Sequence, residues 1–249
     1  MGIAKLESFL EDRIEGFFNR KFASSLEPVE LCKGLEREAT RQARKIDGEK
    51  ILPDEYTFLL SEEDYQRLCA KRILDELYEV AEKLVIKKNC FMDGKLKIEL
   101  KKNHDLSKGM LKVTAAFGGE DKPEPEEATE AKSDTLVLQK PNLNTAPTQP
   151  PKRSLATLQV VEGEDKEASL VLGEQPVYIG RREKSDFIIT DTNVSRTHAY
   201  IAYERHRHLL SDAGSLNGTW INGRRLATHC LQVGDRIGIG SSILVYGVI

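Results

Sequence analysis

A proline-rich stretch divides this 249-residue chain into parts that must fold separately. Residues 120–151 hold most of the prolines, contain no aromatic residue and are rich in Glu, Lys, Thr and Gln. A segment of this composition cannot bury enough apolar surface to form a core, and it is typical of a flexible linker. We therefore predict a multidomain chain: one domain over residues 1–119, a linker over 120–153 and a second domain over 154–249.

The overall charge does not mark the chain as a strongly basic nucleic-acid binder, because 37 basic and 40 acidic residues leave a net charge of −3. The four cysteines, Cys32, Cys69, Cys90 and Cys230, lie far apart without a CxxC pair. This spacing favours reduced thiols over a disulfide framework or a metal site. We expect no metal, no cofactor and no small-molecule substrate.

The chain also lacks the marks of a membrane or secreted protein. No apolar run approaches the roughly 18 residues of a membrane span. The first residues, "MGIAKLESFL", do not have the layout of a signal peptide. We expect a cytoplasmic protein that reaches a membrane surface, where it does so, through its partners.

The first region predicts an α+β domain. Apolar residues at helical spacing indicate a helix over residues 3–18 and a second helix that starts at Pro28 and continues through Ile46 to Gly48. "EYTFLL" is a strand, and Ser61 with Asp64 resembles a capping box that opens a third helix reaching Leu84. "KLKIEL" and "MLKVTAAF" complete the order α-α-β-α-β-β, with helices packed on a small antiparallel sheet.

Two features of this region have alternative interpretations. The aromatic stripe of the first helix could contact a membrane surface or a partner, but a domain of this size needs its large apolar side chains in the core. The lysines of residues 83–112 could form an RNA-binding face. No aromatic pair or GxxG clamp accompanies them, which favours a solvated rim of strands.

The last region predicts an all-β sandwich. It consists of short alternating strands separated by turn residues, and no part of it has helical spacing. Asn222-Gly223 is a strong hairpin signal, because both residues accept the positive φ of a type I′ turn. In a sandwich the loops gather at the ends of the sheets and carry the function.

Three loops, which begin at Gly180, Asn193 and Gly214, share one chemistry. They supply the guanidinium groups of Arg181 and Arg196, the hydroxyl of Ser195 and the side-chain amide of Asn217. These groups are mostly donors, and they complement a phosphoryl group. The alternatives are ordinary turn chemistry and a hydrolase.

The hydrolase alternative would use Ser195 as a nucleophile and His198 as its base. It lacks an acid to orient the imidazole and a GxSxG elbow around the serine. We therefore expect a protein without catalytic residues, in which His198 hydrogen-bonds the backbone and fixes the loop that presents Ser195 and Arg196.

The order of these motifs resembles the forkhead-associated (FHA) domain. Gly-Arg after a strand, Ser-x-x-His, S-x-N-G-T, Asn-Gly and the tail "LQVGDRIGIGSSILVYG" carry the resemblance, which covers residues 155–249. FHA domains are phosphothreonine-peptide readers of eleven strands in two sheets. The resemblance implies that Arg181 and Ser195 contact the phosphate, that Arg196 adds to this contact and that Asn217 holds the peptide backbone.

The resemblance also assigns the neighbouring positions. Leu216 stands where many members of the family have a small polar residue, so it either removes a polar contact or adds apolar surface for the threonine methyl group. Asn193 is placed to influence the choice of a residue beyond the phosphothreonine. The residues expected to shape the loops are Gly180, His198, Gly218, Thr219, Asn222 and Gly223.

The first region resembles the N-terminal domain of bacterial FhaA-type proteins, through "MGIAKLESFLEDRIEGFFNRKF", "LEPVELCKGLEREA" and "LPDEYTFLLSEEDYQRL". The resemblance implies a non-catalytic adaptor in Ser/Thr-kinase signalling linked to cell-envelope synthesis or division. Its partners would be threonine-phosphorylated proteins, such as a Ser/Thr kinase or a cell-envelope regulator. The alternative is a nucleic-acid-binding regulator that uses the lysine-rich N-terminal domain.

The linker and its exit carry threonines that a kinase could modify. A phosphorylated threonine there could dock into the reader of the same chain or of a neighbour, because a linker provides a high effective concentration. The alternative is that they are spacer residues. The threonines concerned are Thr129, Thr135, Thr145, Thr148 and Thr157.

Overall fold

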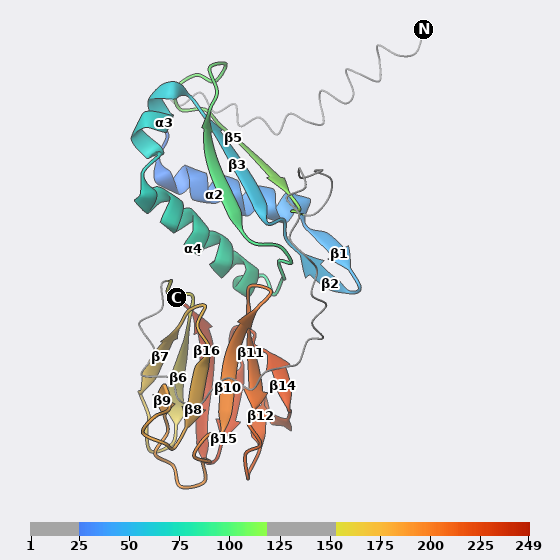
Figure 1. Cartoon of the computed structure of the whole chain (residues 1–249), viewed down its shortest axis with the longest axis vertical. Coiled ribbons are helices and arrows are strands. Elements are labelled where there is room, and N and C mark those ends of the chain that lie inside the picture. The colour runs from blue at the N-terminus through green and yellow to red at the C-terminus, as the bar shows by residue number, and fades with distance from the viewer. Residues whose placement is uncertain (1–24, 119–152) are drawn as a thin grey trace, which may run out of the picture. The chain divides into compact units, whose positions relative to one another are not determined.

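The computed structural model describes residues 25–118 and 153–249 of the chain (Figure 1). They belong to two compact units, Met1–Gly118 and Gly119–Ile249, which we describe separately. The predicted first helix lies outside the described residues, and so do Thr129, Thr135, Thr145 and Thr148. Among the helices that are described, none combines the length and the apolar character that crossing a membrane requires.

The N-terminal unit begins with α2, Pro28–Gln42, whose first turn has the expected proline and a reciprocal capping box between Glu27 and Glu30. The prediction that this helix continues to Gly48 is wrong. After Gln42 the chain forms a hairpin of β1, Arg44–Ile46, and β2, Glu49–Ile51. Asp47 and Gly48 form its turn with φ of 50° and 88°, so Gly48 turns a hairpin and does not cap a helix.

The expected strand is β3, Glu55–Leu60, and Ser61 caps the helix that follows it by accepting a hydrogen bond from the Asp64 backbone N–H. The third helix is not continuous, however. It divides into α3, Glu62–Leu68, and α4, Lys71–Lys87, because Ala70 has an extended conformation with ψ of 144°. The break gives the two helices different directions (Figure 1).

A three-stranded sheet completes the unit, in the order β4-β3-β5, with β4 at Lys97–Lys102 and β5 at Leu111–Ala116. The α+β class is confirmed, but the sheet is mixed and not antiparallel: β3 runs parallel to β4 and antiparallel to β5. The physical reason is the connection, since α3 and α4 lie between β3 and β4. A crossover through helices returns the chain in the same direction, whereas a tight hairpin reverses it.

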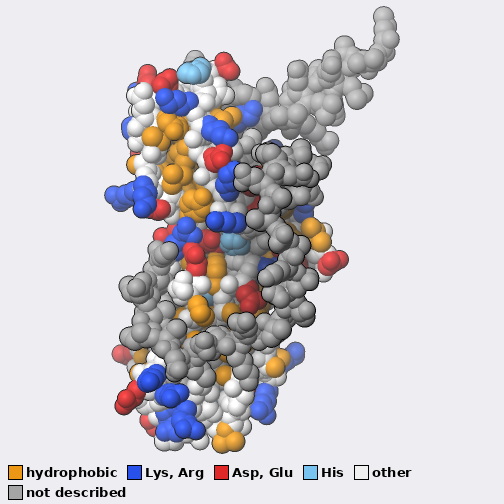
Figure 2. Space-filling model, in the orientation of Figure 1, with side chains coloured by type: hydrophobic (Ala, Val, Ile, Leu, Met, Phe, Trp, Pro, Cys, Tyr) orange, Lys and Arg blue, Asp and Glu red, His pale blue; other side chains and the backbone are white. Residues whose placement is uncertain are grey.

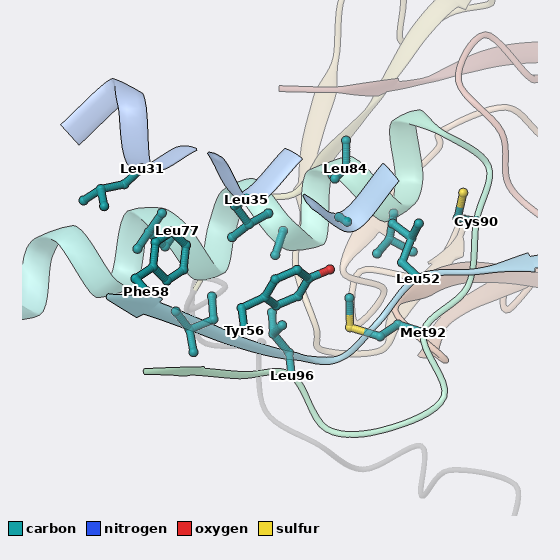
Figure 3. Close-up of a cluster of buried hydrophobic side chains, with 14 of the residues drawn as sticks. Leu31, Leu35, Leu52, Tyr56, Phe58, Leu77, Leu84, Cys90, Met92 and Leu96 are labelled. Atoms are coloured by element: carbon teal, nitrogen blue, oxygen red, sulfur yellow. The ribbon is translucent and has the colours of Figure 1, made fainter. Parts of the chain in front are cut away.

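The core of this unit lies between α2, α4 and one face of β3 (Figure 3). Tyr56 and Phe58 alternate with half-buried residues along β3, so their side chains share the face that meets Leu35 of α2 and Leu77 of α4. Gly34 lets α2 approach β5 closely, because a Cβ atom there would lie 3.0 Å from a methyl group of Val113.

The C-terminal unit is the predicted β-sandwich. Its sheets have the orders β14-β11-β10-β8-β9 and β13-β12-β15-β16-β6-β7. The strands are β6 Ala156–Glu162, β7 Ser169–Leu172, β8 Val177–Gly180, β9 Phe187–Ile188, β10 Ala199–Glu204, β11 Arg207–Asp212, β12 Thr219–Ile221, β13 Arg224–Arg225, β14 Thr228–Cys230, β15 Arg236–Ile239 and β16 Ser242–Val248.

Inward residues of both sheets form the sandwich core. Leu158, Ile201, Ile237 and Leu244 are each almost fully buried, and they alternate with more exposed neighbours along their strands. The sequence did not predict β13 and β14, because their mostly polar residues show no apolar pattern. The Asn222-Gly223 hairpin joins β12 to β13, with φ of 50° and 80° at its two turn residues, as a type I′ turn requires.

Thr157 differs from the expectation for a linker residue. It lies inside β6, half-buried, where its neighbours across the sheet are Gly247 of β16 and Val171 of β7. A residue paired on both sides is held in the sheet, so Thr157 does not belong to a flexible exit from the linker.

Candidate functional site

Ser195 connects the three loops that the sequence singles out. Its carbonyl oxygen accepts a hydrogen bond from the Arg181 backbone N–H at 3.0 Å, which ties the first loop to the second. Its hydroxyl oxygen accepts one from the Leu216 backbone N–H at 3.0 Å, which ties in the third. One serine therefore contacts both neighbouring loops.

Gly180 allows the first two loops to approach each other closely. A Cβ atom at this position would lie 2.4 Å from the carbonyl oxygen of Arg196 and 3.1 Å from that of Ser195, which leaves no room for a side chain. The next two residues continue the contact, since the Arg182 backbone N–H donates to the Arg196 carbonyl at 3.2 Å. The glycine of the Gly-Arg motif is thus needed for packing of backbone on backbone.

Asn217 and Asn193 form the second contact between the last two loops. The side-chain amide of Asn217 donates to the Asn193 carbonyl oxygen at 2.8 Å. The Arg181 side chain also contacts the second loop, where its Nε donates to the Val194 carbonyl at 3.3 Å. The structure thus brings Arg181, Asn193, Ser195 and Asn217 together, although they come from three loops.

His198 holds the backbone of two loops and is fully buried. Its Nδ1 accepts a hydrogen bond from the Ser195 backbone N–H at 3.1 Å, and its Nε2 lies 3.2 Å from the Gly218 carbonyl oxygen, to which it donates in the matching tautomer. Burial lowers the pKa of His198, against the smaller opposing effect of the Gly218 carbonyl. The imidazole is therefore neutral when it makes these contacts.

This geometry gives the Ser195 hydroxyl no general base in His198. The ring nitrogen that faces Ser195 accepts the backbone N–H and not the hydroxyl, and the other nitrogen faces a carbonyl oxygen. A Ser–His nucleophile requires the imidazole to accept the hydroxyl proton. The arrangement is that of a presented hydroxyl and not of an activated one.

Asp212 anchors the third loop, and sequence reasoning missed it. Its carboxylate accepts hydrogen bonds from the backbone N–H groups of Gly214 and Ser215 and from the hydroxyls of Ser215 and Thr219, at 2.6–3.0 Å. Burial alone would raise the pKa of Asp212, but these hydrogen bonds hold it below the usual value. An Asp two and three residues before Gly and Ser is an Asx-turn signal that could have identified it.

Asp191 anchors the second loop in the same way. It is almost fully buried and accepts from the Asn193 backbone N–H at 2.8 Å and from both the N–H and the hydroxyl of Ser241 at 2.6 Å. Burial would raise the pKa of Asp191, and these donors bring it below the usual value. Both carboxylates therefore use their acceptor positions on groups of the protein itself, and both hold the loops in place.

Asn222 acts at a distance from the three loops. Its side chain donates to Asp235 at 2.7 Å and accepts from the Arg236 backbone N–H at 3.0 Å, which pins the hairpin that it shares with Gly223 to β15. The predicted loop-shaping residues therefore divide into two groups. Gly180, His198, Gly218 and Thr219 contact the site loops, and the Asn222-Gly223 turn supports the strands behind them.

Exposed positive charge surrounds the site. Arg181, Arg182, Lys184 and Arg196 are all exposed on the first two loops. Figure 2 shows Lys and Arg side chains gathered at the loop end of the C-terminal unit. Leu216 adds an apolar group to this surface, because 86% of it is exposed. The arrangement offers hydrogen-bond donors and positive charge for a phosphorylated or acidic ligand.

The lysine-rich segment of the N-terminal unit has a different electrostatic character. Lys97 and Lys101 pair with Glu99, at 3.1 Å and 2.7 Å. Lys102 pairs with Glu62 at 2.8 Å, and Lys108 with Glu63 at 3.1 Å. Neighbouring acids thus offset much of this positive charge, which favours a solvated rim over a nucleic-acid interface.

Comparisons with known proteins agree with both halves of the structure. The sequence matches the family described as "FhaA, N-terminal domain" over residues 3–114 and the FHA domain family over residues 177–240.

One similar protein is the oxoglutarate dehydrogenase inhibitor of Corynebacterium glutamicum, 32% identical over 130 residues, which are 50% of this chain and 91% of that protein. Another is the glycogen accumulation regulator GarA of Mycobacterium tuberculosis. It is 34% identical to this chain over 91 residues, which are 36% of this chain and 56% of GarA.

Solved structures with similarity to the chain include FHA domains. One comes from work on phosphothreonine-dependent FHA domain interactions. It is 33% identical in sequence, the match covers 37% of this chain and 95% of that one, and the TM-score is 0.35. Another is an FhaA FHA domain in complex with the intracellular domain of a second protein. It is 34% identical in sequence, the match covers 36% of this chain and 98% of that one, and the TM-score is 0.34.

Proposed function

The chain belongs to the FhaA type of FHA-domain proteins, in which an FhaA N-terminal domain precedes an FHA domain, and on this basis we propose that it is a non-catalytic signalling adaptor. Its FHA unit binds partner proteins that carry phosphothreonine. The two relatives named above are an inhibitor and a regulator, and such names suit proteins that act by binding.

The convergence of three loops on Ser195 is the observation that carries this proposal. It places a hydroxyl beside Arg181 and Asn217, while the nearby carboxylates of Asp191 and Asp212 are engaged in internal hydrogen bonds. A phosphoryl group carries a charge of about −1.5 to −2 and several acceptor oxygens, which such a donor set matches. Arg181 and Ser195 would hold the phosphate, Arg196 would add charge and Asn217 would hold the peptide backbone.

The neighbouring residues give this site its selectivity. Leu216, exposed beside the Ser195 hydroxyl, supplies apolar surface for the threonine methyl group. Asn193, joined to Asn217, stands where it can influence a residue beyond the phosphothreonine.

The test is a titration of the full chain with three peptides that differ only in threonine, phosphothreonine or phosphoserine. We expect binding of the phosphothreonine peptide, weaker binding of the phosphoserine peptide and none of the unphosphorylated one. Arg181→Ala removes a charged donor to phosphate and should reduce affinity about 10- to 100-fold. Arg236→Ala is the matched control, because the Arg236 side chain, on β15, pairs with Glu162 of β6, and the substitution leaves the Arg236 backbone contact with Asn222 in place. Equal binding of all three peptides would refute the proposal.

Kinase signalling linked to cell-envelope synthesis or division, the finer part of the function, stays a prediction of the resemblance. A phosphothreonine reader requires a Ser/Thr kinase upstream, so its partners are kinase substrates or the kinase itself. Recovery of threonine-phosphorylated proteins by the full chain, but not by Arg181→Ala, would test this part. Enrichment of the same proteins by both forms would refute it.

A further inference from the structure

Trp220 is the one tryptophan of the chain, and its side chain is exposed on the outer face of its strand. It lies in β12 between Thr219 and Ile221, which are 2% and 3% exposed, whereas 43% of Trp220 is exposed. Large aromatic side chains contribute most when they are buried in a core or an interface. The outward indole therefore suggests contact with a ligand.

The indole is directly attached to the proposed peptide site. Its Nε1 donates a hydrogen bond to the Asn217 carbonyl oxygen at 3.3 Å. Asn217 in turn donates a hydrogen bond to the Asn193 carbonyl oxygen. The indole therefore contacts a residue that links the second and third loops, which Ser195 also connects. A peptide held by Asn217 would pass beside Trp220.

Arg225 lies next to the same residues. It pairs with Trp220 across the β12–β13 hairpin, and its guanidinium group lies against Gly218. A Cβ atom at Gly218 would be 2.1 Å from the Arg225 Nε, and the φ of Gly218 is +78°. The glycine thus provides the space that the guanidinium group occupies, immediately after Asn217.

Arg225 has no ion-pair partner among the residues that the structure describes, and β12, β13 and β15 contain no acidic residue. The carboxylate of Asp235, just before β15, already accepts hydrogen bonds from Asn222, His229 and the Gln232 backbone. An exposed guanidinium group beside an indole is well suited to bind an anion, because its planar donors match a carboxylate or phosphate.

We propose that Trp220 and Arg225 form a second subsite of the peptide reader, which binds an anionic side chain close to the phosphothreonine. The anion is a carboxylate or a second phosphate: Arg225 bonds it, and the indole face covers its aliphatic stem and limits water access on that side. This inference rests on the proposed function, because it needs a peptide held by Asn217. It adds a preference for acidic or doubly phosphorylated targets.

The experiment uses the full chain and a phosphothreonine peptide with alanine at its flanking positions. A single glutamate, and in a second series a single phosphoserine, is moved through those positions. Calorimetry gives the affinity of each peptide relative to the alanine peptide, and the emission of Trp220 reports contact with the subsite. An exposed ion pair predicts a gain of about two- to fivefold at one position, with a change in indole emission at that position. The two series tell a carboxylate from a second phosphate.

Two arginine variants locate the gain. Arg225→Gln should bring the affinity ratio between anionic and alanine peptides close to one, and Arg225→Lys should retain part of the gain. Arg224→Gln is the matched control: Arg224 is the preceding residue of β13 and pairs with the buried Ile221, so its side chain belongs to the opposite face. The gain should persist in that variant.

The outcomes separate this inference from the proposed function. Failure of the alanine-flanked phosphothreonine peptide to bind the unmodified chain would overturn both. Normal binding of that peptide with no gain at any position would overturn the subsite alone. A gain that survives Arg225→Gln, or that leaves the emission of Trp220 unchanged, would also overturn it.

Discussion

The backbone N–H of Leu216 donates to the hydroxyl oxygen of Ser195 at 3.0 Å, while the Leu216 side chain is 86% exposed. A serine hydroxyl has one donor and two acceptor positions. The contact uses an acceptor position and leaves the hydroxyl hydrogen available for a phosphate oxygen. The same residue pair therefore positions a donor and presents an apolar group beside it, as a phosphothreonine, with its phosphate and methyl group, would require.

Replacing Ser195 with alanine should weaken phosphothreonine binding. The change removes the donor to phosphate and the acceptor for the Leu216 N–H, so we expect a loss of about 10- to 100-fold, measured by calorimetric titration of the full chain. Ser169→Ala, an exposed serine on β7, is the control and should stay within about twofold of the unmodified chain. Equal affinities for the two variants would refute the role of Ser195.

Adding one methyl group at Gly180 should damage the site. In Gly180→Ala the new Cβ atom would lie 2.4 Å from the Arg196 carbonyl, so the first two loops must separate. We expect a loss of about 1–3 kcal/mol in the free energy of unfolding, together with weaker phosphopeptide binding. Gly247→Ala adds the same group at a distance of 3.4 Å from Thr157, an ordinary contact, and should change neither quantity much. Both would be followed by urea denaturation and peptide titration.

Acidification should destabilise the C-terminal unit through His198 at a higher pH than it does through the buried aspartates. Burial lowers the pKa of His198 in the folded state, so below about pH 6.5 the unfolded state binds a proton that the folded state does not. The free energy of unfolding should therefore decrease as the pH falls from about 6.5 towards the lowered pKa. Asp191 and Asp212, whose pKa values are also lowered, lose their contribution only at more acidic pH, below the ordinary range of carboxylates.

Urea denaturation at a series of pH values measures this effect. His198→Gln should have a shallower dependence on pH below about 6.5 than the unmodified chain. His104→Asn, a change at a largely exposed imidazole in the N-terminal unit, is the control. A slope that is the same in His198→Gln as in the unmodified chain would show that His198 does not cause it.

Asp64 should be one of the positions of the N-terminal unit at which a substitution lowers the free energy of unfolding most. This fully buried carboxylate accepts hydrogen bonds from the backbone N–H groups of Leu26 and Gly109, from the Ser61 hydroxyl and from Arg67. Asp64→Ala leaves buried donors without an acceptor and should cost about 3 kcal/mol of the free energy of unfolding.

Glu63→Ala, at the preceding residue of α3, is the matched control for Asp64. Glu63 forms an exposed ion pair with Lys108, so its loss should cost less than about 1 kcal/mol. Thermal or urea denaturation of the two variants would compare them directly. Similar costs for both would contradict the anchoring role of Asp64.

The sequence predicted most of what local chemistry determines. The strands of the sandwich other than β13 and β14, the Asn222-Gly223 turn and the Ser61 cap each depend on residues that are close in the chain, and their patterns were visible. The predicted end of α2 was wrong because Ile46 continues the helical spacing of apolar residues. That spacing outweighed the turn signal of Asp47-Gly48. The mixed sheet could not be predicted, since strand direction depends on how the helices cross it.

The site shows the same division. The motifs identified three loops that the structure brings together, because each loop carries its own turn chemistry. They did not reveal Asp191, whose partner Ser241 lies far along the chain, or Arg225, whose position depends on the space left at Gly218. The contacts of Asp191 with Ser241 and of Arg225 with Gly218 depend on the assembled fold, although Asp191 also makes a local contact with the Asn193 N–H.

The central position of β3 has a consequence for the order in which the N-terminal unit can form. β3 is made early, but both of its neighbours, β4 and β5, follow the two helices α3 and α4 in the chain. During synthesis both edges of β3 therefore stay open until residues 97–116 have emerged from the ribosome, and sheet closure depends on contacts of high sequence separation. A nascent chain that stops before Ala116 exposes the backbone donors and acceptors of β3 to other strands, which makes premature termination there an aggregation hazard.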